Sequence, residues 1–333
     1  MAHMLFSKIV AKTFDGIKLV LAAFCLLLKE KRILVFTMVP AILALLVLLA
    51  GFNSAYHNYL PKNSVFLGAV LSQVYQVPTW NTYVINVLIR FFHLLGATFF
   101  GMAAVFYITQ FFEYRHASLY AAFNATLYKW KTILVWAIVS AIVTTVLYTI
   151  PDTQILFAAS QSDSMLWVPH RFTSILAYVL DIFWAVVTFF ILPILAFENR
   201  SIFQSIKHSW TLMKQFFFQT LGGKVTLMFI TGLFVLVALL VAFGVTKLFA
   251  SSPTGHLSKS LLISFVLVAS VFIAVELIFK VAIYQQARGR HVTPLEAIIQ
   301  TKSHMADGIL IIAGVLGLGA AVTLAVTIFL LLI

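Results

Sequence analysis

The chain has 333 residues, of which 62% are apolar and only 10% are charged. Soluble domains contain about 45–50% apolar and about 25% charged residues, so a water-soluble fold of this length could not bury so much apolar surface. No segment between the apolar runs is long enough to enclose a core of its own. We therefore expect residues 1–333 to form a single, all-α, polytopic membrane domain.

The formal net charge of +12 does not predict nucleic-acid binding, because the basic residues are not concentrated in one face, tail or known reading motif. They lie in short stretches between apolar runs, where a cytoplasmic location and anionic lipid headgroups account for them. We expect these lipids as partners, and no nucleic acid. Cys25 is the only cysteine, so it forms no intramolecular disulfide, and we expect neither a metal nor a cofactor.

The first element in chain order is an amphipathic helix over residues 5–28. Its apolar residues recur at steps of three or four, and they are Phe6, Val10, Phe14, Ile17, Leu21, Phe24 and Leu28. Lys8, Lys12 and Asp15 take the other face, so we expect an interfacial helix. The opening MAHM is typical of an expression tag, and we expect Met4 to be the natural first residue.

Seven apolar runs follow, each long enough to cross a membrane. A spanning helix needs about 20 mostly apolar residues, at 1.5 Å per residue. The runs cover residues 33–52, 84–111, 132–150, 173–197, 225–248, 261–286 and 308–333. The predicted bundle has a six-span core and one further C-terminal span.

The distribution of lysine and arginine predicts the orientation of these spans. Two of the 22 basic residues, Arg90 and Lys280, fall well within predicted spans. With the N-terminus inside, only four lie on the outer side, namely Lys62, Arg171, Lys247 and Lys259. The other sixteen, Lys224 among them, lie on the cytoplasmic side, which is a strong positive-inside signal. An odd number of spans then places the C-terminus outside.

The clearest amphipathic segment between spans begins at Ile202. Its predicted apolar stripe consists of Phe203, Ile206, Trp210, Met213 and Phe217, with Gln204, Lys207, His208 and Lys214 away from the stripe. Ser201 and Gln204 have the spacing of a capping box, and Thr293, Pro294 and Glu296 repeat that signal later in the chain. Both patterns predict helix starts, and the segment after Ser201 is expected in the interface plane or beneath the bundle.

A pattern of span, amphipathic helix and returning span recurs over residues 84–150, 173–248 and 261–333. In the first two units, residues 112–115 (FEYR) match residues 197–200 (FENR) at three of four positions. The pattern indicates an internal duplication.

Residues 190–198 (FILPILAFE), continuing through 202–210 (IFQSIKHSW), carry a span that ends in proline and glutamate and then an amphipathic helix with lysine and serine. This passage resembles a signature of an uncharacterised bacterial membrane-protein family, similar in layout to the membrane domain of some glycerophosphodiester phosphodiesterases. The Glu113 region and residues 278–289 fit the same pattern, whereas the span after residue 307 departs from the family's six-span layout. The resemblance implies a helical membrane fold in a bacterial inner membrane and no established activity.

Ionisable residues well within predicted spans are the first candidates for function, because such residues are costly in a bilayer. They are Arg90, His93, Asp181, Glu276 and Lys280. Glu276 and Lys280 have the i,i+4 spacing of a helical ion pair, and Arg90 and Asp181 lie at similar depths and could meet. One interpretation is a polar pathway that uses His93 as a proton relay. The alternative is structural ion pairing, with Lys280 reaching toward the headgroups.

Enzyme signatures are missing from the sequence. It contains no His-Glu-x-x-His, Gly-x-Ser-x-Gly or phosphate-binding glycine loop. Asp152, Asp163 and His170 share a predicted outer loop, but their spacing is unspecific for a metal. We expect a protein that is not an enzyme.

In the last predicted span, small residues recur every four positions, at Ala313, Gly317, Ala321 and Ala325. Such a stripe lets another helix approach closely, either within the chain or in a homo-oligomer.

Two functions therefore stay open. The first is a non-enzymatic protein that organises lipids or membrane-protein partners through its cytoplasmic amphipathic helices. The second is a transporter or channel that uses the intramembrane charges. A lipid-modifying enzyme has only the family layout in its favour, and no residue indicates the substrate.

Overall fold

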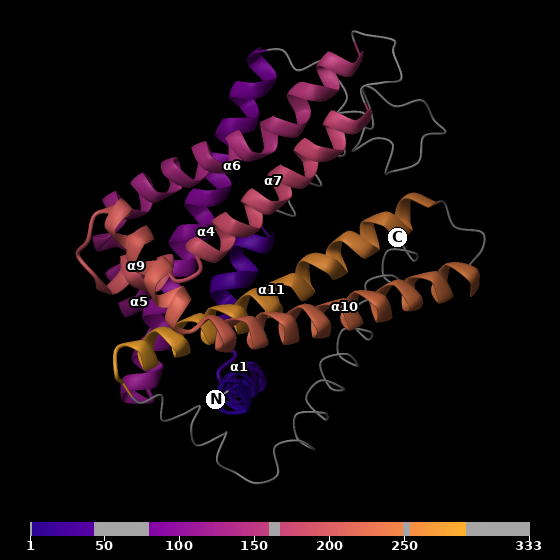
Figure 1. Cartoon of the computed structure of the whole chain (residues 1–333). Coiled ribbons are helices and arrows are strands. Elements are labelled where there is room, and N and C mark those ends of the chain that lie inside the picture. Colours follow the sequence, from indigo (N-terminus) through magenta and orange to yellow (C-terminus); the bar gives the residue numbers. More distant parts are fainter. Residues whose placement is uncertain (1, 43–79, 160–166, 249–253, 291–333) are drawn as a thin grey trace. The chain divides into compact units, whose positions relative to one another are not determined.

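A computed structural model describes residues 2–42, 80–159, 167–248 and 254–290 (Figure 1). These residues are helical apart from short turns and connections, and no strand occurs among them. After the first helix, α1, and the short helix Ile33–Ile42, the elements are α4 to α11. Their bounds are α1 Ala2–Lys29, α4 Trp80–Tyr114, α5 Leu119–Tyr128, α6 Trp130–Ala159, α7 Trp167–Val187, α8 Ile191–Phe197, α9 Ile202–Gln215, α10 Phe217–Leu248 and α11 Thr254–Ala287.

Five stretches in the described part of the chain are long and apolar enough to cross a membrane. They are Phe91–Tyr114, Trp130–Leu147, Tyr178–Phe197, Phe217–Val237 and Val268–Ala287. Each overlaps one of the predicted spans, so the all-α fold and the integral membrane class are confirmed.

Two further predicted spans have no such support. Of residues 33–52, only the ten-residue apolar helix Ile33–Ile42 is described. The span over 308–333 lies outside the described residues, together with its small-residue stripe. A total of seven spans therefore stays a prediction.

The chain divides into two compact units. Unit 1 comprises Met1–Ala69, Ala104–Ala122 and Phe216–Ile333, and unit 2 comprises Val70–Ala103 and Phe123–Gln215. The divisions fall inside α4 and α5 and at the junction of α9 with α10.

In unit 1, α1 packs against α10 and α11, and α10 lies beside α11 (Figure 1). Glycines allow α1 and α10 to touch at the backbone. A Cβ atom on Gly16 of α1 would lie 2.0 Å from the carbonyl oxygen of Gln219, and one on Gly222 of α10 would lie 2.3 Å from that of Thr13. Small residues of this kind are the usual means of close helix packing in membranes. This contact holds the first turns of α10 against α1.

The buried face of α1 differs from the stripe predicted for residues 5–28. Phe14 and Leu28 belong to that stripe, yet both are about half exposed. The residues buried in the second half of the helix are Leu19, Val20, Ala22, Ala23, Phe24, Leu26 and Leu27. They cover most of its circumference because two helices, α10 and α11, contact α1. A single apolar stripe would provide only one contact surface on the helix.

Polar contacts tie the last turns of α4 to the rest of unit 1. The buried Tyr107 hydroxyl donates a hydrogen bond to Glu30 Oε1 at 2.9 Å, just after α1 ends. Glu113 forms an ion pair with Arg290, which follows α11. The ion pair with Arg290 accounts for the glutamate of the FEYR segment at the end of α4.

In unit 2, α6 and α7 lie side by side (Figure 1). Trp136 of α6 stacks on Trp184 of α7, with ring centroids 5.9 Å apart and an interplanar angle of 14°. Aromatic pairs of this kind contribute about 0.5–1.5 kcal/mol beyond area burial. This packing sets the course of α7 toward the site described next.

Candidate functional site

The candidate spanning segment Tyr178–Phe197 is not one continuous helix, contrary to the prediction for residues 173–197. Helix α7 ends at Val187, a turn covers residues 188–190, and α8 begins at Ile191. Pro193 supplies the physical reason, because proline has no N–H and its ring clashes with the carbonyl four residues earlier. In a continuous helix that carbonyl would belong to Phe189.

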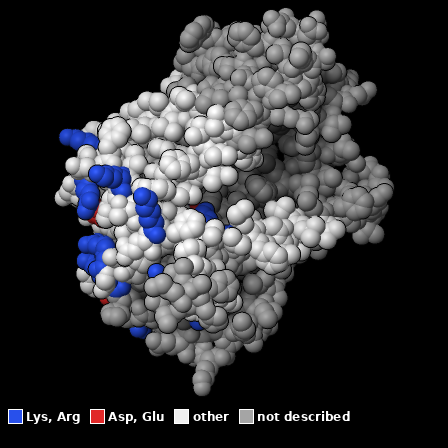
Figure 2. Space-filling model, viewed as in Figure 1, with Lys and Arg blue, Asp and Glu red and all other residues white. Residues whose placement is uncertain are grey.

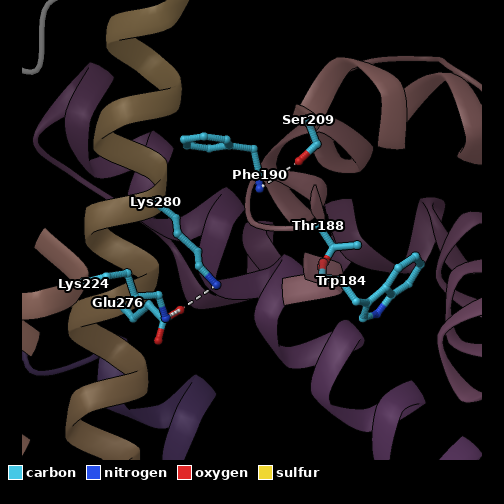
Figure 3. Close-up of polar contacts among 7 residues, drawn as sticks. All are labelled: Trp184, Thr188, Phe190, Ser209, Lys224, Glu276 and Lys280. Carbon is cyan, nitrogen blue, oxygen red and sulfur yellow. Dashed lines mark hydrogen bonds and ion pairs between the residues drawn. The ribbon is translucent and has the colours of Figure 1, made fainter. Parts of the chain in front are cut away.

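A serine from α9 satisfies the backbone donor that this turn leaves open. The N–H of Phe190 donates a hydrogen bond to Ser209 Oγ at 3.1 Å (Figure 3). Both residues are fully buried, and a buried donor without a partner would cost about 1–3 kcal/mol. The turn and α9 therefore hold each other in place. The amphipathic pattern predicts Ser209 on this helix but indicates no role for it.

The start of α9 has the capping box predicted from its sequence. Ser201 Oγ accepts a hydrogen bond from the Gln204 N–H at 3.4 Å, and Gln204 Oε1 accepts one from the Ser201 N–H at 3.3 Å. Two N–H groups at the start of the helix are thereby satisfied within one turn. This prediction is confirmed.

The buried face of α9 is not the stripe predicted from Phe203 to Phe217. The residues buried on α9 are Ser205, Ser209, Leu212 and Met213. Phe203 is 79% exposed, and Phe217 belongs to the next helix, α10. Of the predicted stripe only Met213 is among the buried residues, and a place for the stripe in the interface plane stays a prediction. The buried face instead carries the small residues Ser205 and Ser209, which hydrophobicity alone does not indicate.

The exposed side of α9 combines aromatic and basic groups. Trp210 contacts Phe183 of α7, with ring centroids 5.6 Å apart, and the Lys214 ammonium lies 5.0 Å from the Trp210 ring centroid. Lys207 is exposed, and Ile206 is partly exposed. An apolar and a basic group therefore occur together on the accessible surface of one helix.

Basic side chains of unit 2 gather over α9 and the start of α6 (Figure 2). Lys129 donates a hydrogen bond to Asn199 Oδ1 at 2.8 Å, which joins the end of α5 to the segment before α9. Glu198 forms an ion pair with Arg200, and its Oε1 lies 3.3 Å from His208 Nε2. Lys207 and Lys214 of α9 take part in neither contact and are exposed, so their charge is presented outward.

Unit 1 contains a second cluster, formed by Lys224, Glu276 and Lys280 (Figure 3). Glu276 Oε1 lies 2.8 Å from Lys280 Nζ on the same helix, which confirms the predicted i,i+4 pair. The same oxygen lies 2.6 Å from Lys224 Nζ on α10. The charge pattern predicts Lys224 on the cytoplasmic side, just before the span over 225–248. The described helix begins earlier, at Phe217, and Lys224 lies inside the candidate span Phe217–Val237, so the span bound shifts while the side of the membrane stays a prediction.

An open, mostly apolar groove of about 430 Å³ extends from this cluster between α10 and α11. Its walls are formed by Lys224, Leu227, Met228, Thr231, Gly232, Val235, Phe272 and Glu276. The charged residues lie at one end of the groove, because Lys224 is the first of the α10 residues and Glu276 is the last of those on the antiparallel α11.

Of the other candidate residues, His93 and Asp181 make no described contact with either cluster. His93 is exposed on α4, and Asp181 is partly buried on α7. The side chain of Arg90 is not described, so its predicted meeting with Asp181 stays a prediction. Among the described residues, no group of three His, Cys, Asp or Glu side chains could hold a metal.

Several predictions fall outside the described side chains. They concern Asp152, Asp163 and His170 as a metal site, Thr293, Pro294 and Glu296 as a helix start, and Ala313, Gly317, Ala321 and Ala325 as a packing stripe.

Comparison with known proteins gives one match. Residues 97–295, more than half of the chain, match the model of a family described as a family of unknown function, DUF6159. This range contains the broken span, α9 and the charge cluster of unit 1. No curated protein and no solved structure matches the chain. The likeness in layout to the membrane domain of glycerophosphodiester phosphodiesterases therefore stays a prediction.

Proposed function

The chain belongs to the DUF6159 family, and we propose its function from the site itself, because a family of unknown function brings no activity with it. We propose a non-enzymatic integral membrane protein that gathers anionic lipids at the cytoplasmic membrane face. The bacterial inner membrane, with the N-terminus inside, is part of this proposal. The charge distribution of the sequence supports the orientation.

The surface of α9 carries the proposal. Phe203 is 79% exposed, and Lys207 and Lys214 are exposed on the same helix. An exposed aromatic residue has a favourable place in the headgroup region, and each basic residue near an anionic membrane surface contributes about 1 kcal/mol. The helix is suited to contact lipid from the membrane interface.

The way in which α9 is held supports the same interpretation. Its capping box fixes the start, and the bond from Phe190 to Ser209 fixes its middle against the broken span. Because the helix is already ordered, its lysines can contact a lipid without a further loss of backbone conformational entropy at each encounter.

Spin-label electron paramagnetic resonance on the full chain in mixed vesicles tests this function. Labelled phosphatidylglycerol should be enriched over labelled phosphatidylcholine in the motionally restricted lipid shell. Replacing both lysines, Lys207→Gln with Lys214→Gln, should remove most of this enrichment, since two lysines at about 1 kcal/mol each amount to about 30-fold in affinity. Added salt should reduce the enrichment in the wild type.

Gln215→Ala is the matched control, because Gln215 is also exposed on α9 and carries no charge. It should leave the enrichment unchanged. Equal shells for the two lipids in the wild type, or full enrichment in the double lysine variant, would contradict the proposed function.

A second candidate is a transporter or channel, and the broken span α7–α8 favours it. Transporters form substrate sites at interrupted helices, where backbone groups become available. In this chain the Phe190 N–H is already bonded to Ser209, which favours the lipid function instead. Flux through reconstituted protein decides between them: a transporter should lose flux with Asp181→Asn or Glu276→Gln, whereas wild-type protein without any flux would exclude this role for the ions and solutes tested.

A further inference from the structure

We propose that the corner between α5 and α6 is an anchor that lies among the phospholipid headgroups and fixes the depth of unit 2 in the membrane. The anchor consists of Leu127 and Tyr128 at the end of α5 and of Trp130 and Lys131 at the start of α6. The inference goes beyond the proposed function, because it needs neither a preference for anionic lipids nor the lysines of α9.

The large side chains of this corner are exposed. Tyr128 is 81% exposed, and Leu127 and Trp130 are each 56% exposed. Such groups are unfavourable in water, since burying a large apolar side chain stabilises by about 1.5–3 kcal/mol. Tyrosine and tryptophan also carry a polar group that needs a hydrogen-bond partner. The headgroup region meets both requirements, and these two residue types are enriched there.

The exposed face of α6 places the corner at the membrane boundary. Trp130 is the first residue of the candidate span Trp130–Leu147. Farther along the helix, Val135, Ile138 and Ile142 are exposed and recur at steps of four and three, so they lie on one apolar face. In a spanning helix, such a face contacts the hydrocarbon core. The twelve residue steps from Trp130 to Ile142 correspond to about 18 Å, so Ile142 lies near the middle of the ~30 Å core when Trp130 lies at its edge.

Two lysines of the corner complement the headgroup phosphates. Lys131 is exposed, and its ammonium lies 5.8 Å from the centroid of the Trp130 ring. A lysine at the end of a span keeps its stem on apolar surface while its ammonium reaches the headgroups. Lys129 precedes Trp130 and bonds to Asn199, which is neutral, so this bond does not cancel its charge. Aromatic surface and positive charge together suit a layer of phosphate and glycerol groups better than hydrocarbon or water.

The bond from Lys129 also connects the anchor to α9. Its Nζ donates a hydrogen bond to Asn199 Oδ1 at 2.8 Å, and Asn199 precedes the start of α9 at Ile202 by three residues. All of these residues belong to unit 2. The anchor therefore holds the start of α9 close to the level of the headgroups.

Quenching of tryptophan fluorescence tests the anchor in the full chain, reconstituted in phosphatidylcholine vesicles. Three quenchers are compared, namely bromine atoms on the lipid chains near the headgroups, bromine atoms near the chain ends, and iodide in the water. Trp130→Phe should remove a substantial part of the quenching by the shallow bromines. The loss should be smaller with the deep bromines and with iodide. Trp130→Phe changes an exposed side chain and keeps an aromatic ring, so the fold should not depend on it.

Trp136→Phe is the matched control. Trp136 lies on the same helix, but it is buried and stacks on Trp184 of α7. It should be shielded from the lipid and from the water. This variant should therefore leave the quenching by all three quenchers nearly unchanged.

Three results would overturn the anchor. A loss confined to iodide quenching would place Trp130 in water, and a loss mainly with the deep bromines would place it in hydrocarbon. No loss with any quencher would show that protein covers Trp130, such as a second copy of the chain.

The lipid-shell experiment on α9 separates this anchor from the proposed function. Shallow quenching of Trp130 without enrichment of phosphatidylglycerol in the shell removes only the lipid-gathering role of α9. Enrichment with Trp130 outside the headgroup layer removes only the anchor.

Discussion

The backbone N–H of Phe190 donates a hydrogen bond to the hydroxyl oxygen of Ser209 at 3.1 Å, and this bond joins a break in a spanning segment to an amphipathic helix. Pro193 prevents the uninterrupted helix that would satisfy the donor from within. Ser209 thus links the sequence feature that breaks the helix to the element proposed to contact lipid.

Ser209→Ala should lower the free energy of unfolding by about 1–3 kcal/mol, because the buried Phe190 N–H loses its acceptor. The unfolding of the full chain in detergent measures this change. Thr211→Ala is the control, as Thr211 is exposed on α9 and bonds only within that helix, to the Lys207 carbonyl. Equal stability of the two variants would show that the Ser209 bond is not needed.

The ion pair between Lys224 and Glu276 should show a coupling energy above about 1 kcal/mol in a double-mutant cycle with Lys224→Gln and Glu276→Gln. Exposed ion pairs in water give about 0.2–1 kcal/mol and weaken with salt. A pair within the bilayer should exceed that range and resist salt. A small, salt-sensitive coupling would place the cluster in water instead.

The glycines of unit 1 should differ sharply in their tolerance of alanine. Gly16→Ala should destabilise the protein by about 1–3 kcal/mol, because the new methyl group would lie 2.0 Å from the Gln219 carbonyl oxygen. Gly232→Ala should be neutral or stabilise by up to about 1 kcal/mol, since it meets open space and favours the helix. Thermal unfolding of both variants measures the contrast, and similar melting temperatures would contradict the close packing of α1 on α10.

The predicted orientation is tested by glycosylation during translocation into microsomes. Asn124 and Asn199 each lie in an acceptor sequence, and both should stay unmodified because we place them on the cytoplasmic side. Val65→Thr would complete an acceptor sequence at Asn63, on the predicted outer side, and that asparagine should be modified. Modification at Asn199, or no modification at Asn63, would contradict the predicted orientation.

Local sequence spacing predicted the features that depend on neighbouring residues. The capping box of Ser201 and Gln204 spans three positions, and the pair of Glu276 with Lys280 spans four. Helix geometry alone brings such residues together. The five candidate spans were also accessible from hydropathy, because a long apolar run has few other places in a folded chain.

The contacts that the sequence analysis missed join residues far apart in the chain. Lys224 and Glu276 are separated by 52 positions, and Phe190 and Ser209 by 19. Each contact depends on how two helices pack, which periodicity within one helix cannot specify. The pair Gly222–Gly223 just before Lys224 was a usable signal, since adjacent glycines in an apolar helix favour close packing.

The lipids that accompany the full chain out of its own membrane test the central claim most directly. The chain is extracted in polymer-bounded discs, and the phospholipids in the discs are compared with those of the whole membrane. We predict an increased anionic fraction for the wild type and a smaller increase when Lys207 and Lys214 are both replaced by glutamine. A lipid composition equal to that of the whole membrane in both cases would contradict the proposal that this protein gathers anionic lipids.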